Sequence, residues 1–157
     1  MKTVDEKLLV LSSIAQKFNA AGVTWAVGAS ALLYFHQIAG EFHDLDIMVD
    51  EKDALQAKEI LLTLGTLHPS VQDGRYPTKY FFEFTVDGVE VDLIGGYAIR
   101  KDGVVYDCNL DASQIAGSTE VNGQTIPLQS VQLWRRYYEL MERPAKVALI
   151  DNGCRAT

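Results

Sequence analysis

The chain has 157 residues, a length that suits one domain with its own hydrophobic core and excludes two domains of ordinary size. Hydrophobic residues make up 48% and charged residues 22% of the sequence, which excludes a disordered or fibrous chain. The 14 Lys and Arg against 21 Asp and Glu leave a net charge of −7. Such a surface would repel a phosphate backbone, so broad nucleic-acid binding is not expected.

The sequence predicts neither secretion nor membrane insertion. Its N-terminal segment lacks a long uncharged apolar stretch and a small-residue cleavage site, and no later stretch approaches the roughly 18 apolar residues of a membrane span. Cys108 and Cys154 lie far apart and have no CxxC partner, so neither a disulfide framework nor a zinc site is expected. We therefore expect a cytoplasmic protein.

The first half of the chain is predicted to alternate helices and strands. Apolar residues recur at helical spacing over residues 5–21. Residues 23–27 form a short β-type run that turns into a second helix at Gly28. A second strand is predicted over residues 45–49, followed by an N-cap sequence at residues 50–53 that starts another helix.

The middle of the chain is predicted to form hairpins. Two β-type runs, residues 80–86 and 89–94, flank an Asp-Gly pair, which is the strongest hairpin signal in the sequence. Further Asp-Gly and Asn-Gly pairs at residues 102–103 and 122–123 predict two more hairpins.

The C-terminal part is predicted to be helical. Ser130 is a suitable N-cap for a helical segment over residues 129–150, which is interrupted before Pro144. No repeat or linker divides the chain. The predicted fold is therefore a single α/β (α+β) domain over residues 1–157, with a mixed, partly antiparallel sheet flanked by helices.

Three carboxylates are candidates for metal binding. Asp44 and Asp46 lie two residues apart on a predicted strand, so both can face one hard cation. The two-residue turn of the first hairpin pairs Glu83 with Asp92. Like charges side by side disfavour a sheet unless a cation, a proton or solvent relieves them. The plainer alternative is that these acids form a solvated polar face.

A candidate phosphate site lies at the predicted strand-to-helix turn. From Gly28 to Ser30, free backbone N–H groups, the helix dipole and a hydroxyl group could hold a phosphate. The alternative is that Gly28 serves only to make the turn tight.

Taken together, segments 25–32, 43–49 and 89–94 resemble the nucleotidyltransferase superfamily that includes DNA polymerase β. The chain is most similar to its compact members, which include antibiotic nucleotidyltransferases and minimal nucleotidyltransferases of toxin–antitoxin systems. The resemblance covers residues 20 to 150 and includes the helical segment near the C-terminus.

The resemblance implies a role for each candidate residue. Gly28 and Ser30 would hold the phosphates of a nucleoside triphosphate, and Asp44, Asp46 and Asp92 would bind Mg²⁺ or Mn²⁺. Asp92 would also favour deprotonation of an acceptor hydroxyl. The implied reaction transfers a nucleoside monophosphate to a small-molecule or protein hydroxyl, and pyrophosphate leaves.

Two departures from the family pattern favour an alternative to an active enzyme. No Lys or Arg occurs between Lys17 and Lys52, and Glu41 stands where relatives often have a basic residue. The missing positive charge is expected from elsewhere, and the candidates are Arg75, Lys79, Arg100, Lys101, Arg135 and Arg136. Only a short tail follows the last hairpin, so a partner subunit or a second copy of the chain could complete the site.

The alternative is a catalytically degenerate protein of the same fold that binds a nucleotide or a partner protein. A third interpretation is an unrelated α/β interaction domain in which the acids are solvated.

Overall fold

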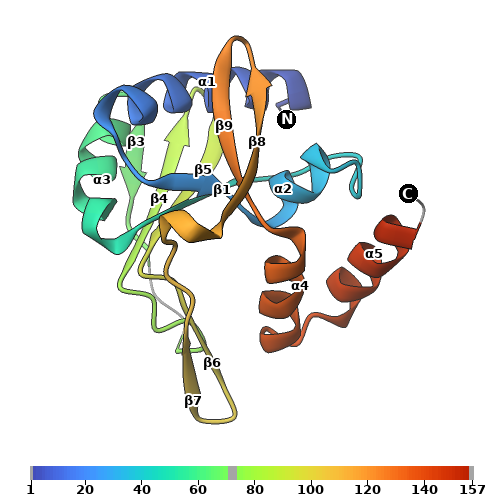
Figure 1. Cartoon of the computed structure of the whole chain (residues 1–157). Helices are drawn as coiled ribbons and strands as arrows, with labels where there is room; N and C mark the ends of the chain where they lie inside the picture. Colours follow the sequence, from blue (N-terminus) through green and yellow to red (C-terminus); the bar gives the residue numbers. More distant parts are fainter. Residues whose placement is uncertain (1, 71–73, 156–157) are drawn as a thin grey trace.

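The structure is a computed structural model that describes residues 2–70 and 74–155. A twisted sheet lies at the centre, and the C-terminal helices stand beside it (Figure 1). The helices of the described chain are α1 (Val4–Ala21), α2 (Ala29–Phe35), α3 (Ala54–Leu62), α4 (Val131–Leu140) and α5 (Pro144–Arg155), with 3₁₀ turns at Glu51–Asp53 and Ala112–Gln114. Among the described residues, no helix is both long and apolar enough to cross a bilayer.

The central sheet is mixed, with the strand order β3-β4-β5-β2-β1-β9-β8. Its strands are β1 (Trp25–Val27), β2 (Leu45–Val49), β3 (Thr66–His68), β4 (Tyr80–Val86), β5 (Val89–Gly95), β8 (Ile115–Val121) and β9 (Gln124–Gln129). Strand β1 runs antiparallel to β2 and parallel to β9, while β2 runs parallel to β5. The predicted fold class is therefore confirmed.

A separate two-stranded hairpin, β6 (Ala98–Lys101) and β7 (Val104–Asp107), extends away from the body (Figure 1). All three predicted hairpins are present. At each turn an Asp or Asn with positive φ, namely Asp87, Asp102 or Asn122, precedes a glycine with positive φ, which is the geometry that Asp-Gly and Asn-Gly favour. Strand β3 was not predicted, because its three residues are too few to show a pattern that stands out from a loop.

The two faces of the sheet are covered by different helices. On one face Leu45 and Ile47 of β2 are fully buried, and Trp25 of β1 contacts Phe18 of α1 edge to face at 5.5 Å. Helix α3 packs on the same face, where Ala54 lies against Gly95. Since side chains alternate along a strand, Asp44 and Asp46 face the other side, which α4 covers.

Helix α4 buries an aromatic stripe against that second face. Trp134, Tyr137 and Met141, which lie at helical spacing, are buried, and Tyr138 is buried with them. Ser130 caps the helix by accepting a hydrogen bond from the Leu133 N–H at 3.2 Å. The fold therefore places the aromatic side chains of α4 over the strands that carry the predicted acids.

Candidate functional site

The acids gather because two strand registers agree. In the β4–β5 hairpin Glu83 lies opposite Asp92, as the two-residue turn predicted. The parallel register of β2 and β5 then places Asp46 directly beside Asp92. Asp44 lies one residue before β2 and interacts with Glu90 of β5. The same register brings them together, because Leu45 pairs with Val91, and Asp44 and Glu90 each come one residue earlier.

The environment raises the pKa of both neighbouring aspartates. Burial raises the pKa of Asp46 to about 8, and the negative charges of Asp92 and Asp44 add to the rise. Burial also raises the pKa of Asp92 to about 7, with further contributions from Asp44 and Glu83. Both carboxylates are half-buried. At neutral pH the metal-free protein therefore keeps a proton on Asp46 that a free aspartate would have released.

Asp44 has a different set of neighbours. Burial raises its pKa, and the carboxyl group of Glu90 raises it further, while His43 and Lys7 act in the opposite direction. Lys7 is a buried lysine whose Nζ donates to the Phe42 carbonyl at 2.6 Å. Glu90 was not among the predicted site residues, because only the β2–β5 register brings it to Asp44.

The donor chemistry of Asp44, Asp46 and Asp92 fits a hard divalent cation. Carboxylate oxygens are the ligands that Mg²⁺ and Mn²⁺ prefer, and a cation would relieve the repulsion that raises the pKa of Asp46 and Asp92. The side chains are not yet arranged as ligands: in the part of the chain that the structure describes, no three His, Cys, Asp or Glu side chains form a metal-binding group.

The predicted phosphate turn lies next to these acids. The Gly28 N–H donates to the Asp46 carbonyl at 3.2 Å, so the turn and β2 are joined at the position of Asp46. Ser30 is half-buried in the first turn of α2. Ala29 has a φ of 53°, a left-handed conformation that is strained for a residue with a side chain.

Trp134 of α4 covers Gly28. A Cβ added at Gly28 would lie 2.5 Å from the Trp134 indole, so only glycine fits beneath this ring. The indole Nε1 donates to the Oε1 of buried Gln129 at 2.8 Å, which fixes the ring over the turn. Close packing against the Trp134 ring therefore requires glycine at position 28, a requirement that the sequence did not reveal.

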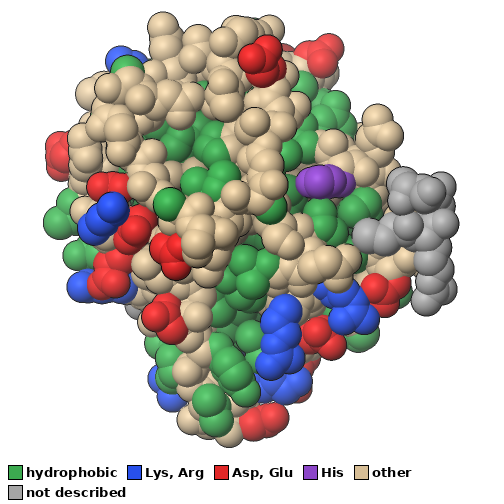
Figure 2. Space-filling model, viewed as in Figure 1, with side chains coloured by type: hydrophobic (Ala, Val, Ile, Leu, Met, Phe, Trp, Pro, Cys, Tyr) green, Lys and Arg blue, Asp and Glu red, His purple; other side chains and the backbone are tan. Residues whose placement is uncertain are grey.

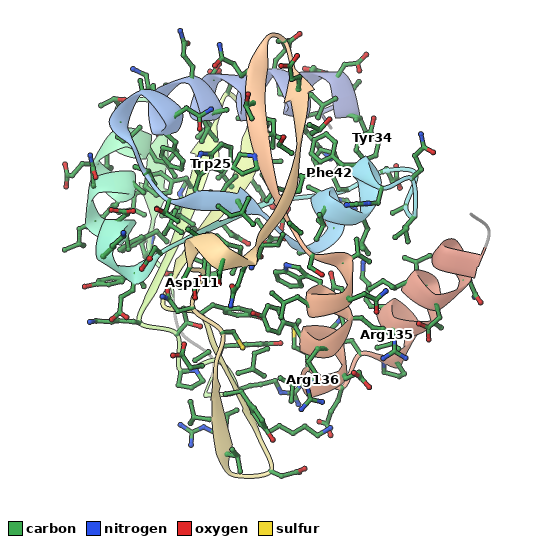
Figure 3. All side chains as sticks on the ribbon, in the orientation of Figure 1. Trp25, Tyr34, Phe42, Asp111, Arg135 and Arg136 are labelled. Atoms are coloured by element: carbon green, nitrogen blue, oxygen red, sulfur yellow. The ribbon has the colours of Figure 1, made fainter. Side chains whose placement is uncertain are left out.

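The predicted sources of positive charge are mostly engaged elsewhere. Lys79 pairs with Glu51 at 2.5 Å, and Arg75 lies 3.8 Å from Glu142. Arg135 lies between α4 and α5, where it donates to Asp151, and Arg136 lies beside the β6–β7 hairpin (Figure 3).

The cations that act on Asp46 are Arg143 and Lys146, which the sequence analysis did not propose. Both positive charges oppose the rise in the pKa of Asp46. Their charged groups lie 5.6 Å and 5.9 Å from the centre of the Tyr138 ring. Burial lowers the pKa of Lys146, and Arg143 lowers it further. Their three-residue spacing around Pro144 was visible in the sequence, but only the α4–α5 packing relates it to Asp46.

Comparisons with known proteins bear on the fold. No protein-family model matches the sequence, and a search of curated proteins gives no match. A candidate nucleotidyltransferase from Thermotoga maritima matches in structure with a TM-score of 0.75 and 24% identity, over 97% of this chain and 94% of that one. The antibiotic-resistance factor ANT(2'')-Ia, solved with adenylyl-2''-tobramycin, matches with a TM-score of 0.62 and 10% identity, over 94% of this chain and 89% of that one.

The lincosamide antibiotic adenylyltransferase LnuA, solved with lincomycin bound, matches with a TM-score of 0.58 and 13% identity, over 96% of this chain and 98% of that one. These matches span nearly the whole of each chain. The protein therefore has the compact fold of the nucleotidyltransferases, as the sequence resemblance implied.

Proposed function

We propose that the protein is a metal-dependent nucleotidyltransferase that transfers a nucleoside monophosphate from a nucleoside triphosphate to a hydroxyl group. The observation that carries this proposal is the parallel pairing of Asp46 with Asp92. Burial and the charges of Asp92 and Asp44 keep a proton on Asp46, and a divalent cation would take the place of that proton.

Each residue has a role in this proposal. Asp44, Asp46 and Asp92 hold Mg²⁺ or Mn²⁺, and Asp44 reaches it by leaving Glu90. When bound, the metal neutralises charge on the attacking and leaving oxygens of phosphoryl transfer. Asp92 also accepts the proton of the acceptor hydroxyl, the role that the resemblance to the nucleotidyltransferases implies.

The phosphates of the nucleotide would lie between the turn and the C-terminal helices. Ser30 and the backbone N–H groups at the start of α2 bind one side, while Gly28 keeps the turn beside Asp46. Arg143 and Lys146 supply the positive charge that the stretch from Lys17 to Lys52 lacks. A small-molecule acceptor is favoured over a protein, because ANT(2'')-Ia and LnuA were solved with antibiotics or their products.

Calorimetry and product detection test the proposal. Mg²⁺ and each of the four ribonucleoside triphosphates are titrated into wild type, Asp46→Asn and Asp102→Asn, the last being the same substitution in the exposed β6–β7 turn. We expect Mg²⁺-dependent binding to wild type and Asp102→Asn but not to Asp46→Asn. Pyrophosphate release with a hydroxylated acceptor would then establish the transfer. Metal-independent binding that survives in Asp46→Asn would contradict the proposed site.

A second candidate function is nucleotide or partner binding without chemistry. It is favoured by the interaction of Asp44 with Glu90, which engages one of the three predicted metal ligands with a second carboxyl group. Tight nucleotide binding without pyrophosphate release, for any acceptor tried, would support this function over the first.

A further inference from the structure

A pocket lies away from the acids, where the C-terminal end of α2, the β8–β9 hairpin, the start of α4 and the end of α5 meet. Its volume is about 350 Å³, within the range of small-molecule sites. Residues that line it include His36, Ser118, Gln129, Ser130, Ile38 and Val131. We call it the α2–α4 pocket.

The wall of the α2–α4 pocket is uncharged. Among the described residues that line it there is no Lys, Arg, Asp or Glu, although charged residues make up 22% of the sequence. His36 is its one titratable side chain. Figure 2 shows this face, where Lys and Arg side chains gather lower down over α4 and the region around α2, β8 and β9 is mostly uncharged. The described part of the wall therefore offers no full charge to replace the hydration of an anion or a cation.

The polar groups of the wall suit a ligand that both donates and accepts hydrogen bonds. Gln129 is only 1% exposed, and its Nε2 has one weak contact, 3.5 Å to Gln114 Oε1. A primary amide nitrogen carries two N–H groups, so it retains the capacity to donate to a ligand. The Ser130 hydroxyl oxygen accepts from Leu133, which leaves its O–H as a donor.

Aliphatic side chains form another part of the wall, with Ile38, Leu128 and Val131 among them. Hydroxyl groups both donate and accept, and they match amides and serine hydroxyls. A ring carrying such hydroxyls also has an apolar face that packs on aliphatic side chains. We propose that the α2–α4 pocket binds a small uncharged molecule with hydroxyl groups on a ring, of the kind found in sugars and nucleosides.

The pocket is connected to the candidate site through one side chain. Gln129 lines the pocket and also holds the Trp134 indole at 2.8 Å, and the indole covers Gly28 beside Asp46. A ligand that binds the Gln129 amide therefore changes the surroundings of the Trp134 indole N–H. This inference goes beyond the proposed function and does not depend on it.

Nuclear magnetic resonance of the ¹⁵N-labelled full chain tests the proposal. The chain has two tryptophans, so the Trp134 indole signal is identified by its loss in Trp134→Phe. The probes are glucose, adenosine and inorganic phosphate. Ser118→Phe adds bulk at the pocket wall, and Thr63→Phe, on the exposed end of α3, is the matched control.

We expect glucose or adenosine at millimolar concentration to move the Trp134 indole signal and the amide signals of residues 116–118 in a saturable way. Ser118→Phe should weaken this binding about tenfold, while Thr63→Phe leaves it unchanged. The proposal is overturned if neither neutral probe shifts these signals, if inorganic phosphate shifts them more strongly, or if Ser118→Phe binds as wild type does. None of these readouts requires catalytic activity.

Discussion

Replacing Asp46 with Asn should remove a large part of the loss of stability that the metal-free protein suffers as the pH rises. The pKa of Asp46 lies near 8 in the folded protein, against an ordinary value of 3.8. Because the folded-state pKa is the higher one, the contribution of Asp46 to stability is fully present below about pH 4, where both states are protonated. It is lost between about pH 4 and pH 8, where the unfolded chain has released the proton and the folded chain still holds it. The asparagine side chain has no proton to release.

The size of the effect follows from proton counting. Between about pH 5 and pH 7 the unfolded chain has lost the Asp46 proton and the folded chain retains it, a difference that approaches one proton. The free energy of unfolding of wild type then falls by about 1.4 kcal/mol per pH unit. Asp92, with a pKa of about 7, adds a second contribution of at most the same size. Asp46→Asn should be the more stable protein at about pH 8.

Urea unfolding in the presence of EDTA, followed by tryptophan fluorescence at about pH 5, 6, 7 and 8, measures this slope. Asp102→Asn is the control, since it removes a carboxylate from the exposed β6–β7 turn. Adding Mg²⁺ at about pH 8 should stabilise wild type and not Asp46→Asn. A free energy of unfolding of wild type that stays constant across this range, or the same slope in Asp46→Asn, would refute a raised pKa of Asp46 as the cause.

Other substitutions examine the turn and the cations. Ala29→Gly should raise the free energy of unfolding in urea by about 1 kcal/mol, since it removes a left-handed alanine; an unchanged value would mean that the turn is not strained. Gly28→Ala should cost about 1–3 kcal/mol because its Cβ would lie 2.5 Å from the Trp134 indole. The same change in a Trp134→Leu background should cost less, and equal costs would exclude the steric explanation. Arg143→Ala and Lys146→Ala should each weaken triphosphate binding about tenfold in calorimetry, whereas Arg136→Ala, beside Tyr106, should leave it unchanged.

The local features of this fold were readable from the sequence. The Asp-Gly turn at residues 87–88 determined the register of its hairpin, and the pairing of Glu83 with Asp92 followed from it. The strand over residues 45–49 was predicted with its observed bounds, because Asp44 and Asp46 alternate with Leu45 and Ile47 and the run then stays apolar to Val49. Each of these features depends on neighbours within a few residues.

The features that the sequence did not reveal depend on distant segments. The contact of Asp44 with Glu90 requires the parallel register of β2 and β5. Arg143 and Lys146 act on Asp46 across about a hundred residues of chain, and the cover of Trp134 on Gly28 spans a similar separation. Spacing and periodicity describe single elements, so they cannot report which elements meet.

The place of β9 in the sheet has a consequence for how the protein is made. Strand β1 emerges early from the ribosome, yet one of its two neighbours is β9, whose residues are made about a hundred positions later. Until then β1 has an open edge, and Gly28 lacks the indole that covers it. The surroundings of the acids are thus completed only after synthesis of α4 and α5, and a nascent or truncated chain presents an unprotected strand edge to chaperones and to other chains.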